Sequence, residues 1–328
     1  MILMLGTVMW GQEFSKAGTS AAQFLKFPVD ARTAALAGSH AGLYGDVASL
    51  HWNPAGIAAL KQTSMALTYS DLYFGIRHSF FGIVMPLPRN GAVGVSAIIL
   101  DSGEIEQTTV SQPEGTGALF HVRNYAFGFS FARYMTGWLM LGGTIKYVRE
   151  DVWNESAQAV AFDIGSVLET GVLGMKLGMS ISNFGTDMKL GGDDLKFPLE
   201  TEAFTIERGA ELKTEPWPLP WRFQVGVAVD VIGGTSQIAQ HETHRLTVLG
   251  QYNEFNDVGA QSNFGMEYEW NNILSARLGY FNKYDAPKLS YGLGVAFNVD
   301  KRRLNLDFAL VDNDRLGFVQ LFSLEMAF

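Results

Sequence analysis

Large apolar side chains alternate with small or polar ones along most of the chain after Ser64. Between Arg123 and Tyr134, aromatic residues occupy every second position from Tyr125 to Phe131, and alanine, glycine and serine lie between them. Successive side chains of an extended strand point to opposite faces, so this two-residue period predicts β-strands. About 14 such segments follow one another with turn residues between them. The pattern therefore predicts an all-β protein.

The charged residues of these segments decide which face meets which environment. They fall on the face that carries the small residues. A charge on the lipid side of a barrel wall costs about 2–4 kcal/mol at the bilayer midplane. The large apolar face is therefore expected to meet lipid. The inward charges are expected to neutralise one another in a wet lumen. The residues with this inward parity are Lys146, Asp163, Lys176, Arg222, Asp230, Glu267, Arg277 and Asp307.

A soluble β-sandwich has the same two-residue period with its faces reversed, and local sequence leaves it open. Segment length favours the barrel. The segments run for about 10 to 13 residues, whereas sandwich strands usually have about 5 or 6 and barrel spans need about 9–11.

The last segment, from Gly317 to Phe328, places Phe318, Phe322 and Phe328 on one side of an extended chain. A strand that ends the chain in this way leaves an exposed edge unless it pairs with another strand. A closed barrel provides that pairing. Ending on an aromatic residue is also typical of bacterial outer-membrane barrels, which implies insertion by the barrel-assembly machinery.

The connections alternate in length. Several are tight, whereas the connections at 102–122 and 185–220 are long. Outer-membrane barrels have short periplasmic turns and longer external loops. We therefore expect a 14-stranded antiparallel transmembrane β-barrel with both termini in the periplasm.

Composition agrees with a barrel in the outer membrane. Hydrophobic residues make up 47% of the chain and charged residues 17%, whereas soluble domains average roughly 25% charged. No stretch approaches the roughly 20 apolar residues of a spanning helix. The chain has no cysteine, which is compatible with an oxidising compartment. Its net charge of −9 gives no reason to expect nucleic acid as a partner.

Residues before the first strand have a different character. The apolar start suggests a remnant of a secretory signal in residues 1–12, although the usual basic start is missing, and a short buried segment is the alternative. Residues 13–62 lack the strand period and are expected to plug the barrel of residues 63–328, with helical turns near 48–50 and 57–60. Because about eight strands already close an interior, a wider barrel has room for a plug. Deleting residues 47–60 should therefore raise single-channel conductance.

The plug region carries an ordered set of motifs. Residues 18–26 and 30–38 are followed by Trp52, Asn53, Pro54, Ala55 and Gly56. This set resembles the N-terminal signature of the PorV/PorQ family, which is similar in turn to FadL-like barrels with 14 strands and an Asn-Pro-Ala element in an N-terminal hatch. The resemblance is detailed over about the first 60 residues, and each of these glycines and prolines also has an ordinary structural role.

Two functions follow from the resemblance, and neither involves enzymatic chemistry. The first is a component of type IX secretion that binds exported proteins or translocon subunits. The second is a FadL-like channel for long-chain fatty acids or other hydrophobic compounds. We favour the first hypothesis at this stage because binding pockets for hydrophobic compounds are mostly apolar, while the predicted lumen has small residues and mixed charges.

The external loop 195–221 is the candidate partner-binding surface, because aromatic anchors dominate protein contacts. Its candidate residues are Phe197, Phe204, Trp217 and Trp221. For Trp221, membership of the interfacial aromatic girdle is an equally good interpretation.

We expect no catalytic residues, no cofactor and no metal. His241 and His244 are three positions apart, but on a strand or turn they are expected to point to opposite sides. The chain carries no phosphate-binding loop, dinucleotide fingerprint or EF-hand loop.

Overall fold

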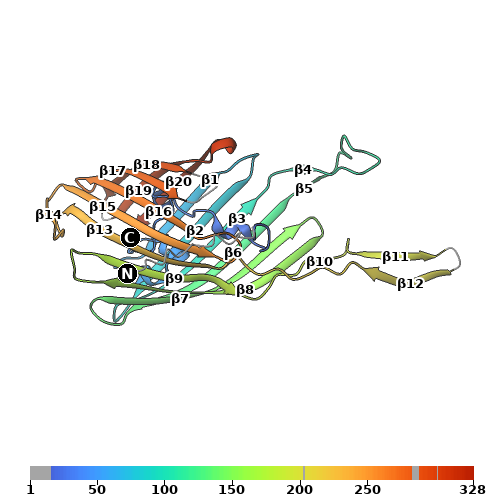
Figure 1. Cartoon of the computed structure of the whole chain (residues 1–328), viewed down its shortest axis with the longest axis horizontal. Coiled ribbons are helices and arrows are strands. Elements are labelled where there is room, and N and C mark those ends of the chain that lie inside the picture. The colour runs from blue at the N-terminus through green and yellow to red at the C-terminus, as the bar shows by residue number, and fades with distance from the viewer. Residues whose placement is uncertain (1–15, 202–203, 283–287, 301) are drawn as a thin grey trace, which may run out of the picture.

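The structure is a computed structural model that describes residues 16–201, 204–282, 288–300 and 302–328. Within them, fourteen antiparallel strands form a closed barrel, which confirms the predicted architecture (Figure 1). The strands are β1 (Ser64–Asp71), β2 (Arg77–Leu87), β3 (Gly91–Asp101), β6 (Val122–Tyr134), β7 (Leu139–Val152), β8 (Glu155–Glu169), β9 (Lys176–Gly185), β13 (Arg222–Gly233), β15 (His244–Phe255), β16 (Gln261–Trp270), β17 (Leu274–Asn282), β18 (Leu289–Val299), β19 (Arg302–Asp312) and β20 (Phe318–Ala327).

The barrel closes between its first and last strands. Ser64 on β1 lies opposite Ala327 on β20, and the register continues to Asp71 opposite Gln320. No edge is left at either strand, because β1 also pairs with β2 and β20 with β19. This closure explains why an amphipathic, aromatic strand can stand at the end of the chain.

The faces of the strands are as predicted. Outward residues such as Phe127, Phe162 and Phe322 are about half exposed and form an apolar belt around the wall. Monomeric soluble proteins rarely expose a continuous apolar surface of this size. On the inside, oppositely charged residues pair as expected: Lys146 with Asp163 at 2.8 Å, and Lys176 with Asp230 at 3.1 Å.

The two ends of the barrel differ. The short-turn end carries the tight connections and the C-terminus, while the long-loop end carries the two long connections (Figure 1). These contain short strands that the sequence did not indicate: β4 (Ile105–Glu106) with β5 (Leu119–Phe120), and β11 (Lys196–Thr201) with β12 (Phe204–Glu211).

Two smaller strands are added to the barrel wall near its ends. β10 (Gly191–Gly192) pairs with β8, and β14 (Ala239–Gln240) pairs with β13. Residues 170–175 form the connection between β8 and β9. A final 3-10 helix, η3 (Asp314–Leu316), lies between β19 and β20.

The segment from residue 16 to residue 63, called here the N-terminal segment, lies inside the barrel. It contains η1 (Gln23–Lys26), α1 (Ala31–Ala35), α2 (Ser49–Trp52) and η2 (Pro54–Ala59). α1 packs against β17 to β20, and η2 against β6 to β8 on the other side of the lumen. The described helices are short, and none is long and apolar enough to span a membrane.

Local chemistry explains two of these turns. Asp30 caps α1, since its carboxylate accepts a hydrogen bond from Thr33 N at 2.7 Å. Asn53 does the same for η2 through Ala55 N, and Pro54 occupies the first helical position. The predicted turns at 48–50 and 57–60 are displaced by a few residues, while η1 and α1 were not predicted.

The N-terminal segment crosses the lumen along its length. Ala21 N donates to Pro218 O at the long-loop end, whereas the segment joins β1 at the short-turn end. The predicted signal remnant, residues 1–12, lies outside the described residues.

Candidate functional site

The interior of the barrel is lined by glycines where the N-terminal segment passes. A Cβ added to Gly178 would lie 1.5 Å from Ala41 O, and one added to Gly142 would lie 2.6 Å from Ala55 N. Side chains at these positions would overlap the segment's backbone. Inward glycines whose added Cβ would lie within 3.1 Å of a backbone or side-chain atom of the segment occur on nine strands: Gly82, Gly94, Gly142, Gly165, Gly178, Gly226, Gly265, Gly279 and Gly292. The small-residue face of the sequence is therefore the space that the segment occupies.

Polar side chains of the wall satisfy the segment's irregular backbone. Gln251 accepts from His40 N at 2.9 Å and from Ala41 N at 2.8 Å, and it donates to Gly38 O at 3.1 Å. Asn263 donates to Ala37 O. Buried backbone groups need partners, so these side chains hold the segment in one position.

The five residues of the predicted plug motif lie in the middle of the lumen, all buried. Trp52 O accepts from Ser180 at 3.0 Å and also from Gln224. The Asn53 amide donates to Ser166 O at 3.0 Å. The motif therefore joins β8, β9 and β13, with Pro54, Ala55 and Gly56 forming η2 against β6 to β8.

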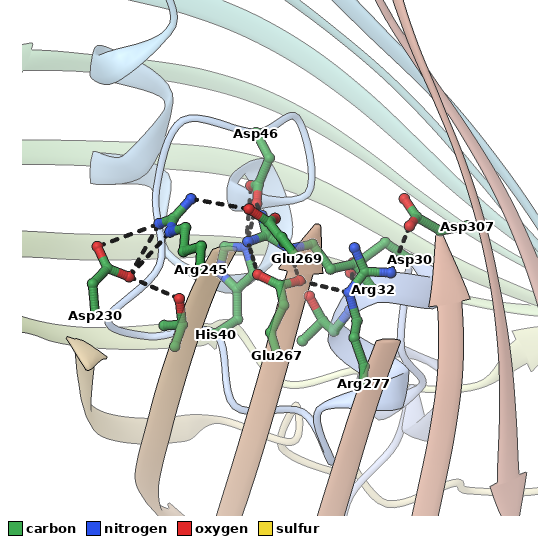
Figure 2. Close-up of polar contacts among 12 residues, drawn as sticks. Asp30, Arg32, His40, Asp46, Asp230, Arg245, Glu267, Glu269, Arg277 and Asp307 are labelled. Atoms are coloured by element: carbon green, nitrogen blue, oxygen red, sulfur yellow. Dashed lines mark hydrogen bonds and ion pairs between the residues drawn. The ribbon is translucent and has the colours of Figure 1, made fainter. Parts of the chain in front are cut away.

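A cluster of charges fixes α1 to the opposite wall (Figure 2). Arg32 binds Glu267 through two contacts of 2.8 and 2.6 Å. Arg277 binds the same carboxylate at 2.5 Å and Asp307 at 2.6 Å. We call Arg32, Glu267, Arg277 and Asp307 the Arg32 cluster. Since Glu267 is almost fully buried, each arginine compensates a charge that has no access to water.

Asp46 connects this cluster to the next turn of the segment. It lies 3.3 Å from Arg32 and 3.1 Å from His40, and it accepts from the Ser49 hydroxyl at 2.8 Å. Burial by itself raises the pKa of Asp46, but His40 and Arg32 outweigh it and the pKa is lowered. Burial raises the pKa of Asp30, despite its hydrogen bond from Trp52 Nε1.

Asp257, in the loop between β15 and β16, holds the start of the segment at the long-loop end. Its carboxylate accepts hydrogen bonds from Lys26 at 2.5 Å, from Gln23 at 2.7 Å and from the Ser20 hydroxyl. Hydrogen bonds from three groups and the Lys26 charge lower the pKa of Asp257 against the opposing effect of burial.

Hydrophobic residues pack around these contacts in the lumen. Phe24 and Leu25 of η1 are buried in one hydrophobic cluster with residues of the wall and the long loops, and Phe27 packs against it. The wall and loop residues of this part of the cluster include Leu100, Ala157, Ala159, Met188 and Leu219.

The short-turn end is polar instead. A cavity of about 530 Å³ reaches inward from it to Arg32, Asp46 and Arg277. On the outside of the wall, a separate apolar hollow of about 660 Å³ lies over β1, β2 and β18 to β20. Thr68 and Ser323 line both spaces, and their hydroxyls are 2.9 Å apart. At this place the wall alone separates the inner cavity from the apolar outer surface.

The structure describes the side chains of two of the four predicted partner-binding residues, Trp217 and Trp221. Trp217 is exposed, and its backbone pairs with Met188. Trp221 directly precedes β13 and is partly buried. Phe197 and Phe204 lie on β11 and β12, farther along the loop, and their side chains fall outside what the structure describes.

The expectation that His241 and His244 point to opposite sides is wrong. Their rings are 4.4 Å apart, because the connection before β15 folds back and brings them together. His244 also lies 2.6 Å from the Tyr268 hydroxyl. Among the described residues no group of three or more potential ligands for a metal is present.

No protein-family model matches the chain, and no curated protein sequence matches it. Solved structures do. A FadL homologue of Pseudomonas aeruginosa superposes with a TM-score of 0.57 over 92% of this chain and 98% of that one, at 12% identity. The Pseudomonas putida toluene transporter TodX gives 0.55 over 90% and 96%, at 14% identity. The Ralstonia pickettii toluene transporter TbuX gives 0.56 over 91% and 97%, at 11% identity.

These likenesses extend over nearly the whole of each chain, so they concern the complete architecture. At such low identity they establish the fold and leave the function to be argued separately. The assignment to the PorV/PorQ family is not confirmed. The chain has a FadL-like outer-membrane barrel fold.

Proposed function

We propose that this protein is a bacterial outer-membrane channel for hydrophobic small molecules, closed at rest by its N-terminal segment. The observation that carries the proposal is the filled lumen, whose long-loop end holds a hydrophobic cluster and whose blocking element η1 belongs to the N-terminal segment. The structural neighbours include two toluene transporters and a monoaromatic hydrocarbon channel. They are transport proteins, which is consistent with a non-enzymatic role.

The apolar belt supports placement in a membrane, since outward charges would be costly there. In this proposal the long loops lie outside the cell and the short turns in the periplasm. We place both termini in the periplasm as well, which is a prediction from strand number and loop length.

A hydrophobic solute would enter at the long-loop end, where it can replace the contacts that Phe24, Leu25 and Phe27 make with the wall. For this exchange η1 must leave its site, and the Asp257 contacts oppose that movement. The polar cavity at the other end would accept the displaced segment or the solute's polar group. The proposal needs no chemical step, only movement of the segment.

Uptake of radiolabelled toluene and oleate by intact host cells tests this function, with cells carrying empty vector as the baseline. The host lacks its own transporters for these compounds. We expect uptake above baseline for at least one of the two. Uptake at the baseline, by a folded barrel present in the outer membrane, would contradict the proposal.

Asp257→Asn should increase that uptake severalfold. The substitution keeps the size of the side chain but removes the charge that binds Lys26, so η1 leaves its site more readily. Asp314→Asn, which changes an exposed carboxylate at the same end of the barrel, is the matched control and should have no effect. Equal uptake by the Asp257 variant and wild type would show that these contacts do not limit entry.

The secretion hypothesis remains a prediction from the resemblance, and the comparisons lend it no support. Gentle extraction from native membranes separates the two functions. Exported proteins or a translocon subunit in the eluate would favour secretion, whereas a barrel that carries only hydrophobic small molecules would favour the channel.

A further inference from the structure

A hollow of about 370 Å³ lies on the outside of the barrel, at the long-loop end of β6, β7 and β8. It faces away from the lumen, on the outer side of the wall. Its lining includes the basic residues Arg123 and Arg149, the acidic residues Asp151 and Glu155, and Trp153 and Ser156. Two arginines on the outer surface of a barrel wall are unexpected where the neighbouring outward residues are apolar.

These residues belong to a row of charges that crosses five strands. Asp71 on β1 lies opposite Arg77 on β2, and Arg77 lies opposite Asp101 on β3. Asp101 in turn lies opposite Arg123 on β6, which lies opposite Asp151 on β7. Arg149 stands two positions before Asp151 and shares its outward parity. The row therefore contains three arginines and three aspartates, all at the same end of the wall.

The row marks the level at which the apolar belt ends. The next outward residues toward the middle of the wall are Tyr125 and Phe127 on β6, whose rings stack 6.4 Å apart. On the other side, Trp153 meets Phe120 edge to face at 5.3 Å. Tryptophan and tyrosine at the boundary between an apolar belt and polar loops are typical of the membrane interface. The hollow thus lies at the level of lipid headgroups.

Both arginines of the hollow are paired with aspartates. Arg123 binds Asp101 through Nε at 3.0 Å, and Arg149 binds Asp151 through Nε and Nη2 at 2.8 Å. A guanidinium has five N–H donors, and these contacts use one side of each. Both guanidinium groups line the hollow, and a pair of guanidinium groups matches the oxygens of a phosphate group.

We propose that this hollow binds the phosphorylated headgroup of a membrane lipid. The phosphate lies between Arg123 and Arg149, with Ser156 and the Trp153 ring at its edge, and the acyl chains run down over Tyr125 and Phe127. The site is independent of what passes through the lumen. It requires only that the apolar belt be embedded in a bilayer.

Titration of the purified barrel in detergent, followed by native mass spectrometry, tests this site. The probes are bisphosphorylated lipid A, the same lipid after removal of its phosphates, and inorganic phosphate alone. The variant is Arg123→Gln with Arg149→Gln, and the control is Arg302→Gln, an exposed arginine at the short-turn end. Heat-dependent mobility on gels establishes that each variant is a folded barrel.

We expect wild type and the control to bind the phosphorylated lipid at least tenfold more tightly than the double variant and than the dephosphorylated lipid. Equal affinity for both lipids, or no loss in the double variant, would overturn the proposal. Inorganic phosphate that competes at concentrations similar to the lipid's would also overturn it, by identifying a site for free phosphate instead of a headgroup.

Discussion

Replacing Gly178 with valine is expected to expel the N-terminal segment from the lumen and to convert a closed barrel into a conducting pore. The new Cβ would overlap the backbone of Ala41, at 1.5 Å from its carbonyl oxygen. A backbone atom cannot move aside as a flexible side chain can. Overpacking typically costs about 1–3 kcal/mol and sometimes more, and here it affects the plugged state alone. The fraction of open barrels should rise by roughly tenfold to a hundredfold.

Planar-bilayer recording measures this effect directly. The matched control is Gly250→Val on β15, an outward position where an added Cβ meets only the Phe264 ring, at 3.9 Å. That variant should conduct like wild type. If Gly178→Val folds into a barrel and yet conducts no more than the control, the segment is not what closes the lumen.

Removing the Arg32 side chain should have the second large effect. Arg32→Met keeps the bulk of the stem but leaves Glu267 with Arg277 alone in a buried position. Loss of one partner from a buried pair costs about 3–5 kcal/mol. Arg32 is partly exposed, so the lower end of that range applies. A cost of about 3 kcal/mol corresponds to roughly a hundredfold change in the ratio of open to closed barrels.

The same substitution separates stability of the wall from closure of the lumen. The strand pairing around Glu267 does not involve Arg32, so the barrel should keep its heat-dependent gel mobility while the segment becomes sensitive to added protease. Arg303→Met, at an exposed arginine beside the short-turn cavity, should leave protease resistance unchanged. Resistance that survives in Arg32→Met would mean that the Arg32 cluster does not retain the segment.

The barrel was predictable because its strands must satisfy one strong rule. Lipid on one side and a wet or packed interior on the other impose a period of two over every span. Phe127, Phe129 and Phe131 therefore indicate the lipid face without any knowledge of neighbours. The inward charges were predictable for the same reason, and pairs such as Lys146 with Asp163 needed only the register of adjacent strands.

The closed lumen was harder to predict, because its contacts join residues far apart in the chain. The sequence shows the inward glycines as a small-residue face. It does not show why these residues must be small, because the backbone that Gly178 contacts belongs to a segment more than 100 residues away in the chain. Gln251 and Asn263 look like ordinary polar lumen residues until the backbone that they bind is known. The mixed charges suggested a wet interior, whereas much of that space is packed by the N-terminal segment.

The sequence favours the secretion hypothesis for the same reason, because it does not show which residues fill the lumen. A lumen judged only by its charged and small residues appears unsuited to hydrophobic solutes. The apolar residues at the long-loop end come largely from η1, the strand ends and the long loops, where no strand period reveals which way a side chain points.

The most direct test of the account locks the segment in place and measures transport. The chain has no cysteine, so Leu36→Cys with Gly265→Cys introduces a single pair. Their Cβ atoms would be about 3.1 Å apart, slightly closer than in an ordinary disulfide. We expect the oxidised variant to lose uptake of toluene and oleate and a reductant to restore it. Equal uptake before and after reduction, with the disulfide verified by mass spectrometry, would contradict movement of the segment as a whole and would restrict the moving part to the residues before Leu36.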